Sequence, residues 1–366
     1  MDSAQTRHAP PAPEGAPPAI EADGLVKTYP VKGRPDGVRA LDGLTVSVPA
    51  GQVFGLLGPN GAGKSTTVKV LTTLAAADSG SARVAGFDVR KEAGRVRRSI
   101  GVVAQRSGAD PSATGRENLI LQGRLYGMRG ADARRRAGEL LERFDLADAA
   151  RRQVRTYSGG MQRRLDVAIG LMHRPRVLFL DEPTTGLDPE ARTAMWAEIE
   201  RLAGTDGLTI LLTTHYLEEA DRLAARLAIV DRGRIVVQGT PDELKGELRG
   251  DAVHVELRDA PEESGDPDGL RLYEALGRAN GVREIVLDGR RVSARADDGA
   301  SAVPAVLAEL DRAGYAVAAV TVARPSLDDV YLRYAGRRYS EAEAAGPAPS
   351  SPSEPALADA TAGGTR

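Results

Sequence analysis

The stretch from residue 53 to residue 67, VFGLLGPNGAGKSTT, constrains the fold more than any other part of the chain. Its first five residues are an apolar run that predicts a buried strand, and a helical pattern follows from 65 to 74. Between them, Gly58, Gly61 and Gly63 belong to the spacing G-x-x-x-x-G-K-S of a phosphate-binding P-loop. A strand, a glycine-rich loop and a helix N-terminus in this order predict a fold that binds a nucleoside triphosphate.

The loop is suited to phosphate because its glycines let the backbone N–H groups turn inward without obstruction by a Cβ atom. Lys64 can reach the β- and γ-phosphates, and the hydroxyl of Ser65 is suited to Mg²⁺. A glycine-rich turn that binds nothing is the alternative, and the ordered succession of strand, loop, lysine, serine and helix argues against it. The predicted nucleotide-binding residues are Gly58, Pro59, Asn60, Gly61, Ala62, Gly63, Lys64, Ser65 and Thr66.

Composition excludes several other classes of protein. A chain of 366 residues can form one sizeable core and a second small domain, and its net charge of −2 predicts no large nucleic-acid surface. It has no cysteine and four scattered histidines, so neither a disulfide framework nor a structural zinc site is expected. No apolar run approaches the ~20 residues that cross a bilayer, so a membrane role would require a partner that supplies the spanning helices.

Changes in composition and pattern divide the chain into segments. Residues 1–19 are rich in proline and alanine and lack the apolar core of a signal peptide, which predicts a disordered lead. Residues 20–244 are expected to form the nucleotide-binding domain, with a helical subdomain at about 107–173. A small accessory domain is expected at 245–338, and a disordered tail at 339–366.

Within the larger domain, short apolar runs alternate with helical patterns, which predicts a mostly parallel sheet covered by helices. A glycine- and proline-containing loop is expected at 33–37 between the first two strands, and residues 82–106 alternate β-like runs with basic turns. The other predicted strands are 25–26, 44–48, 177–180, 209–213, 228–230 and 234–237, and the predicted helices are 116–126, 131–144, 161–172, 190–203 and 217–227.

The accessory domain has its own pattern of elements. Strands are expected at 253–257, 282–287, 291–296 and 316–322, and helices at 270–279 and 302–313. This βαββαβ order predicts a small ferredoxin-like module. We find no catalytic motif in it.

An acidic pair follows the apolar run Leu178-Phe179-Leu180. A carboxylate at the C-terminal end of a buried strand beside the P-loop strand lies where Mg²⁺ needs an oxygen, and Asp181 suits that role. Glu182 could reach past the metal to act as general base on the attacking water. A solvated acidic turn is the alternative for an isolated Asp-Glu, and the P-loop upstream favours the functional interpretation.

A second glycine-containing helix start lies at Ser158-Gly159-Gly160-Met161-Gln162, directly after Tyr157. Exposed amides at a helix N-terminus are suited to an anion, although Ser158 could also be an ordinary helix cap. Because the P-loop already cradles the phosphates from one side, a second phosphate-reading loop is useful if it closes over a nucleotide held by another copy.

These three motifs together resemble the nucleotide-binding domain of ATP-binding-cassette (ABC) proteins, over about residues 20–240. The resemblance depends on the order of Gly58–Thr66, Ser158–Gln162 and Leu178–Pro183. It implies an α/β P-loop NTPase fold with an inserted helical subdomain, followed here by the small C-terminal α+β module. It also implies ATP hydrolysis with Mg²⁺ in a head-to-tail homodimer.

The resemblance assigns roles to four further residues. Tyr29 matches an aromatic side chain that stacks on adenine, and Gln105 matches a glutamine that contacts Mg²⁺ or water and links the nucleotide to the helical subdomain. Asp188 matches a loop that crosses the dimer interface, and His215 matches a histidine that senses the γ-phosphate. In isolation, the same four residues could be a strand-edge tyrosine, a glutamine with no particular role, a helix-capping aspartate and a structural histidine.

The C-terminal residues 325–331, PSLDDVY, look like those of drug-resistance ATPases of the daunorubicin-exporter type. That narrower likeness implies export of a hydrophobic drug or antibiotic through a separately encoded integral-membrane permease. It places the chain at the cytoplasmic face of the membrane and implies no nucleic-acid partner. Residues 106–115 match the pattern of the family least, so this stretch gives the least information about contacts with the partner.

Three alternatives remain open. A soluble cassette ATPase acting on ribosomes or DNA would resemble this chain around the nucleotide, but such proteins tend to carry two cassettes or a long coiled-coil insertion. A switch GTPase or a small-molecule kinase would not explain Ser158-Gly159-Gly160, and no Asn-Lys-x-Asp motif occurs. A regulatory ATPase whose C-terminal module senses a ligand is the third.

Overall fold

The structure is a computed structural model that describes residues 17–31, 33–248, 250–261, 266, 269–336 and 339. These residues form two compact units, which meet in the chain between Thr240 and Pro241. Most of the predicted lead at 1–19 and all but the first residue of the predicted tail at 339–366 lie outside the described residues. The domain limits expected from composition therefore stay predictions.

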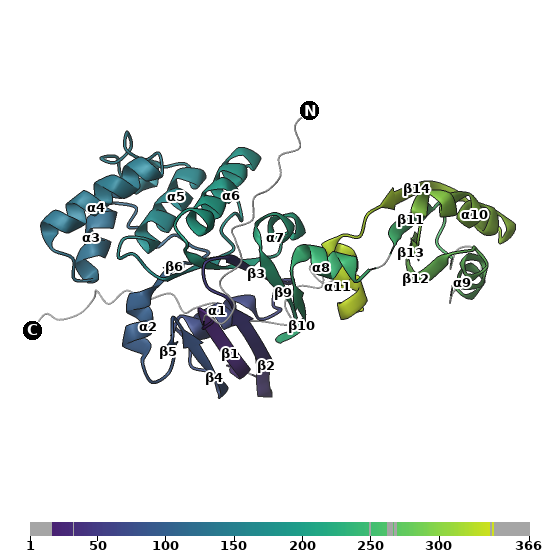
Figure 1. Cartoon of the computed structure of the whole chain (residues 1–366), viewed down its shortest axis with the longest axis horizontal. Helices are drawn as coiled ribbons and strands as arrows, with labels where there is room; N and C mark the ends of the chain where they lie inside the picture. Colours follow the sequence, from purple (N-terminus) through teal and green to yellow (C-terminus); the bar gives the residue numbers. More distant parts are fainter. Residues whose placement is uncertain are drawn as a thin grey trace, which may run out of the picture. The chain divides into compact units, whose positions relative to one another are not determined.

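The first unit contains a six-stranded sheet in the order β10-β9-β3-β8-β7-β6. Figure 1 labels β10, β9, β3 and β6 of this sheet. All neighbouring strands pair in parallel except β10 and β9, which are antiparallel. The mostly parallel sheet predicted from the sequence is confirmed. Its strands are β3 (Val53–Leu57), β6 (Ile100–Val103), β7 (Val177–Asp181), β8 (Thr209–Thr214), β9 (Arg226–Asp231) and β10 (Arg234–Gly239).

Helices of the first unit lie on both faces of this sheet, as Figure 1 shows. Two expectations about the helices were wrong. A helix at Ala93–Ser99 lies in the stretch expected to hold only β-like runs, and the helix predicted at 217–227 ends at Leu223. The helices are α1 (Lys64–Leu71), α2 (Ala93–Ser99), α3 (Gly115–Leu125), α4 (Gly130–Arg143), α5 (Gly159–Gly170), α6 (Pro189–Gly204) and α7 (Leu217–Leu223), with a short 3₁₀ turn at Val154–Thr156.

The early end of α7 has a tertiary cause. Arg226 and Leu227 pair in parallel with Phe54 and Gly55 of the P-loop strand, so they belong to β9. The apolar residues there satisfy a helical pattern, but a place beside a central strand buries them and pairs their backbone groups. Local pattern alone could not distinguish the two outcomes.

A second sheet of the first unit is antiparallel and has the order β2-β1-β4-β5. The loop expected at 33–37 is mostly strand, because β1 and β2 form a long hairpin that pairs Val31 with Arg34. Near the turn, Gly33 and Asp36 are exposed and Gly37 and Val38 are half-buried, so no apolar run marks this part of the hairpin. The strands are β1 (Ile20–Val31), β2 (Arg34–Val48), β4 (Ser79–Val84) and β5 (Phe87–Asp88).

The apolar core has a layer on each face of the six-stranded sheet. Alternate residues of β7 point to opposite sides, so Leu178 and Leu180 join one cluster and Phe179 joins the other. The first cluster includes side chains of α3, α4, α5 and α6, and the second includes side chains of α1, α2 and the antiparallel sheet. A strand buried on both faces explains the continuous apolar run that precedes Asp181.

The second unit has a four-stranded sheet in the order β12-β13-β11-β14, with every neighbouring pair antiparallel. Apolar side chains of α9 and α10 pack on one face of it, among them Leu272, Leu276, Val306 and Leu310. From β11 to β14 the elements follow the βαββαβ order on which the ferredoxin-like interpretation depends. The elements are α8 (Pro241–Gly246), β11 (Asp251–Leu257), α9 (Leu270–Gly277), β12 (Val282–Asp288), β13 (Arg291–Ala296), α10 (Gly299–Arg312), β14 (Val317–Ala323) and α11 (Leu327–Ala335).

No helix in the part of the chain that the structure describes has both the length and the apolar character needed to traverse a lipid bilayer.

We predict that Gly101→Ala destabilises the first unit by about 1–3 kcal/mol, because a buried β6 has no room for another methyl group. A Cβ atom at Gly101 would lie 2.4 Å from the carbonyl oxygen of Gly170 and 2.9 Å from Leu178 Cδ1. Chemical denaturation measures the change. The matched control is Gly94→Ala in α2, where no atom lies within 4 Å of the added Cβ. Equal stability of the two variants would contradict this packing.

Candidate active site

The P-loop connects the end of β3 to the start of α1 in a conformation that depends on glycine. A Cβ atom at Gly58 would lie 2.4 Å from the carbonyl oxygen of Val230, and Gly63 has a φ of 113°. Gly63 is also the N-cap of α1, and no side chain caps its first turn. The backbone N–H groups at this helix start are therefore suited to an anionic ligand.

Lys64 bends back over the loop. Its side chain is 4% exposed, and Nζ donates hydrogen bonds to the carbonyl oxygens of Gly58 at 2.6 Å and Pro59 at 3.1 Å. The same Nζ lies 3.7 Å from Oε1 of Glu182. These contacts hold a positive charge at the centre of the loop, where a phosphate chain would meet it.

A hydroxyl oxygen and a carboxylate oxygen lie close together beside the loop. Ser65 Oγ donates a hydrogen bond of 3.3 Å to Oδ1 of Asp181, and Thr213 Oγ1 donates one of 2.5 Å to the same atom. Asp181 and Thr213 are paired residues of the parallel strands β7 and β8, so the sheet register fixes this contact. A hydroxyl and a carboxylate oxygen are the ligands that Mg²⁺ prefers, so this pair fits the expected metal.

Glu182 is the residue around which the other polar groups gather. Gln105 Nε2 donates to its Oε2 at 3.1 Å, and His215 Nδ1 lies 3.4 Å from its Oε1. Its backbone N–H donates to Oγ1 of Thr213 at 3.0 Å, and its φ is 49°. A left-handed conformation in a non-glycine residue is costly, so the surrounding hydrogen bonds must hold it.

The charge state of Glu182 follows from its neighbours. Burial favours the neutral acid, but the hydrogen bond with His215 and the charges of Lys64 and His215 outweigh it, so the pKa of Glu182 is lower than usual. The carboxylate is thus ionised at neutral pH while only 9% exposed. An ionised, buried carboxylate beside the phosphate loop can accept a proton from water.

Arg163 is a functional residue that the sequence interpretation missed. It lies in α5, is buried, and donates hydrogen bonds to four backbone carbonyl groups. These acceptors are Ala104 at 2.6 Å, Asp181 at 3.0 Å, Glu182 at 3.2 Å and Pro183 at 2.8 Å. One guanidinium therefore connects α5 to the backbone on either side of Glu182. In the sequence, the only indication of a role for Arg163 was its position directly after Gln162.

Glu219 of α7 is a second missed residue. It is 1% exposed, and its Oε1 accepts hydrogen bonds from Thr184 Oγ1 at 2.8 Å and Trp196 Nε1 at 3.0 Å. These contacts tie the loop after Glu182 to α6. An acidic residue in the first turn of a helix gave no sequence signal for this, because such residues are common there for electrostatic reasons.

The Ser158–Gln162 segment forms the start of α5. Ser158 Oγ accepts a hydrogen bond from the backbone N–H of Met161 at 3.3 Å, and Ser158 and Gly159 are exposed. Gln162 Nε2 donates to the carbonyl oxygens of Val154 and Tyr157, each at 3.4 Å. The hydrogen bonds of Ser158 and Gln162 thus stay within the start of α5 and the residues directly before it.

Tyr29 and Asp188 also lie apart from the cluster around Glu182. Tyr29 is half-buried in β1, where it pairs with Val38, and Lys27 Nζ lies 5.5 Å from the centre of its ring. Asp188 caps α6, accepting a hydrogen bond from the N–H of Ala191 at 2.8 Å. The structure thus gathers Lys64, Ser65, Gln105, Asp181, Glu182 and His215, and leaves Tyr29, Asp188 and Ser158–Gln162 outside that network.

Fold and site together define a P-loop nucleoside triphosphatase with an inserted helical subdomain. A family model described as ABC transporter matches residues 41–185, and a model described as ATP-binding protein DrrA1-3-like, C-terminal domain, matches residues 239–335. Both the resemblance to ABC proteins and the narrower likeness of the C-terminal module are confirmed.

Curated relatives resemble nearly the whole chain. It is 48% identical over 326 residues to the daunorubicin resistance ATP-binding protein DrrA3 of Streptomyces coeruleorubidus, covering 88% of this chain and 98% of that protein. It is 34% identical to the linearmycin resistance ATP-binding protein LnrL of Bacillus subtilis (strain 168), covering 87% and 98%.

A solved ATP-binding cassette has the same fold. Its dimeric post-hydrolysis structure, bound to ADP and Pi, matches with a TM-score of 0.56 and 25% identity, covering 60% of this chain and 98% of that one. The chain belongs to the ATP-binding proteins of ABC transporters, within the group related to daunorubicin resistance. It binds ATP, and its ATP hydrolysis serves transport. Membership also implies dimerisation and a membrane permease as partner.

We predict that Arg163→Lys lowers the rate of ATP hydrolysis roughly 10- to 100-fold, because a lysine cannot hold carbonyl groups on both sides of Glu182 and the carboxylate is then misplaced. Steady-state kinetics and ATP binding are measured together, and the affinity for ATP should change little. The control is Arg164→Lys at the next position, whose guanidinium contacts Phe144 and Asp145. Wild-type hydrolysis by Arg163→Lys would contradict the positioning role.

Proposed function

We propose that this protein hydrolyses ATP to power a membrane exporter, as one of two identical copies that enclose two ATP molecules head to tail. The observation that carries the proposal is the network around Glu182. Lys64, Gln105 and His215 surround this buried carboxylate at the edge of the P-loop. Such a network is suited to positioning a water molecule against a phosphate.

Binding of the triphosphate is assigned to the P-loop. Its backbone N–H groups and Lys64 meet the phosphate oxygens, and contact with ATP would replace the hydrogen bonds that Lys64 makes to Gly58 and Pro59. Ser65 and Asp181 would hold the magnesium ion, and Gln105 hydrogen-bonds to the adjacent Glu182. When bound, Mg²⁺ neutralises charge on the phosphates and fixes their orientation.

Hydrolysis is assigned to Glu182 with His215. Glu182 accepts a proton from the attacking water through a carboxylate that is ionised at neutral pH. His215 hydrogen-bonds either to that carboxylate or to the γ-phosphate, which keeps base and phosphate in line. Since the P-loop amides and Lys64 stabilise the charge of the transition state, catalysis is mostly positioning and electrostatics.

The second copy completes the site. Ser158 and Gly159 are exposed and Gly160 is half-buried, at a helix start that can meet the γ-phosphate held by the other copy's P-loop. Asp188 lies in the loop that crosses the interface, and Tyr29 stacks on adenine in its own copy. Placement of these residues outside the Glu182 network supports this division, because a single copy leaves the nucleotide open on one side.

The partner and cargo are proposed from the relatives. The protein named for daunorubicin resistance and the one named for linearmycin resistance support an antibiotic or other hydrophobic drug as cargo. We propose a separately encoded integral-membrane permease that carries the spanning helices, with this subunit at the cytoplasmic face. The helical subdomain would transmit dimer opening to that permease through Gln105.

A soluble cassette ATPase acting on ribosomes or DNA is the competing function. The single P-loop, the short helical block and the balanced charge argue against it. Affinity capture from detergent-solubilised membranes separates the two. Recovery of a protein with several membrane-spanning helices supports the exporter, and recovery of ribosomes instead would overturn it.

We predict that Glu182→Gln lowers the rate of ATP hydrolysis by about 10²- to 10⁴-fold while ATP binding persists, because the amide keeps the shape but cannot accept the proton. Lys64→Ala should instead lose ATP binding, since it removes the charge at the centre of the loop. Phosphate release and nucleotide binding are measured for both. Wild-type hydrolysis by Glu182→Gln would remove the base assignment, and tight ATP binding by Lys64→Ala would remove the phosphate assignment.

A further inference from the structure

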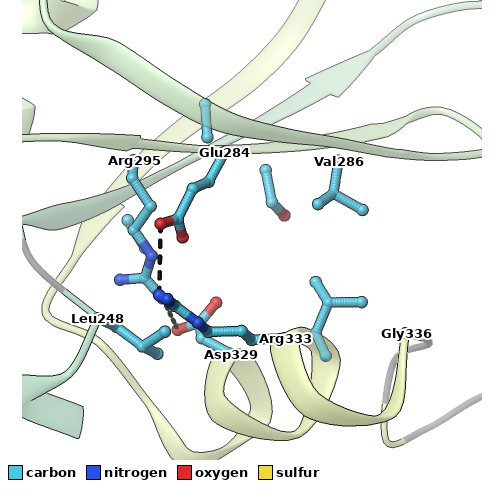
Figure 2. Close-up of a pocket in the computed structure, with 11 residues that line it drawn as sticks. Leu248, Glu284, Val286, Arg295, Asp329, Arg333 and Gly336 are labelled. Atoms are coloured by element: carbon cyan, nitrogen blue, oxygen red, sulfur yellow. Dashed lines mark hydrogen bonds and ion pairs between the residues drawn. The ribbon is translucent and has the colours of Figure 1, made fainter.

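The second unit contains a cavity that the ATPase site does not use. It has a volume of ≈ 370 Å³ and lies between the sheet strands β12 and β13 and the helix α11. Figure 2 shows Glu284, Val286 and Arg295 reaching from the sheet, with Asp329 and Arg333 opposite them on the helix. Its volume falls in the range of ~300–1,000 Å³ typical of small-molecule sites.

Arg295 is the distinctive group of this cavity. It is 5% exposed, yet its contacts with described residues are long: Nη1 to the carbonyl oxygen of Gly250 at 3.5 Å, and Nη2 to Oδ2 of Asp329 at 3.6 Å. Burial lowers the pKa of Arg295, and the charges of Arg333 and Arg283 act in the same direction against those of Asp329 and Glu284. A buried guanidinium with such contacts can accommodate a better acceptor.

The two carboxylates of the cavity already have closer partners. Oδ2 of Asp329 accepts hydrogen bonds from Ser326 N at 2.9 Å and Ser326 Oγ at 2.8 Å, which cap α11. Glu284 pairs with Arg333 at 3.3 Å, and both side chains are nearly half exposed. Exposed pairs of this kind are weak and exchange readily with water, so Arg333 can also turn towards a ligand.

Apart from Ser293, the remaining walls are apolar. Leu248, Ala252, Val286 and Leu332 contribute aliphatic surface. An apolar wall beside a buried cation selects a molecule with a hydrophobic body and an acceptor at one end. A ligand cation would meet carboxylates that are already engaged, and it would lie against Arg295. A planar carboxylate instead matches the paired N–H donors of a guanidinium.

We propose that this cavity binds a small amphipathic monocarboxylate, with its carboxylate on Arg295 and its apolar body against Val286 and Leu332. The site lies wholly within residues 248–336, so it does not depend on the ATPase assignments and can fail without affecting them. It gives the C-terminal module a ligand of defined chemistry.

Calorimetric titration of the full chain with octanoate tests the proposal, with octanamide and octylammonium as ligands of the same length. We expect saturable binding of octanoate, about tenfold weaker binding of octanamide, and weaker binding still of octylammonium. Equal affinity for octanoate and octanamide would overturn the proposal, and so would the absence of saturable octanoate binding.

Two variants and a matched control locate the site. Arg295→Gln should reduce the affinity for octanoate to that for octanamide, while Arg291→Gln, which removes the same charge from β13 outside the cavity, should leave it unchanged. Val286→Phe places a larger side chain at the half-buried wall of the cavity and should weaken the binding of both octanoate and octanamide. This variant therefore tests the location of the site even if Arg295→Gln fails to fold. Unchanged octanoate binding by folded Arg295→Gln or by Val286→Phe would overturn the assignment.

Discussion

Parallel pairing of β3, β8 and β7 is the constraint on which the active site depends. Because the three strands run in the same direction, their C-terminal ends meet at one edge of the sheet. The P-loop follows β3, Asp181 ends β7, and His215 follows β8. The registers of β3 with β8 and of β8 with β7 therefore together bring Ser65 close to Asp181. These two residues form the proposed magnesium site.

Burial then makes the edge chemically useful. Both faces of β7 and β8 are covered by apolar side chains, so Glu182 enters a site with little water. Burial raises the pKa of a carboxylate there, and the hydrogen bond with His215 and the charge of Lys64 lower it. Arg163 adds rigidity by binding the carbonyl groups around Glu182. The charge of Glu182 and its position thus have separate causes.

The site residues that could be predicted from the sequence are each marked by a short local pattern. Lys64, Asp181 and His215 each follow a strand that reads as an apolar run, so their meeting at one sheet edge could be expected. Arg163 and Glu219 could not be expected, because their roles depend on backbone carbonyl groups and loops distant in the chain. The hairpin that pairs Val31 with Arg34 was missed for a different reason, because the residues near its turn contain no apolar run.

The central claim is that one copy supplies the P-loop and another supplies Ser158. The cysteine-free chain allows a direct measurement. Copies of Glu182→Gln carrying Asn60→Cys are mixed with copies of Glu182→Gln carrying Ser158→Cys and treated with a short bismaleimide. The account predicts a cross-linked dimer in the mixture, dependent on ATP and Mg²⁺ and weak in either variant alone. A mixture that forms no such dimer with ATP would contradict it.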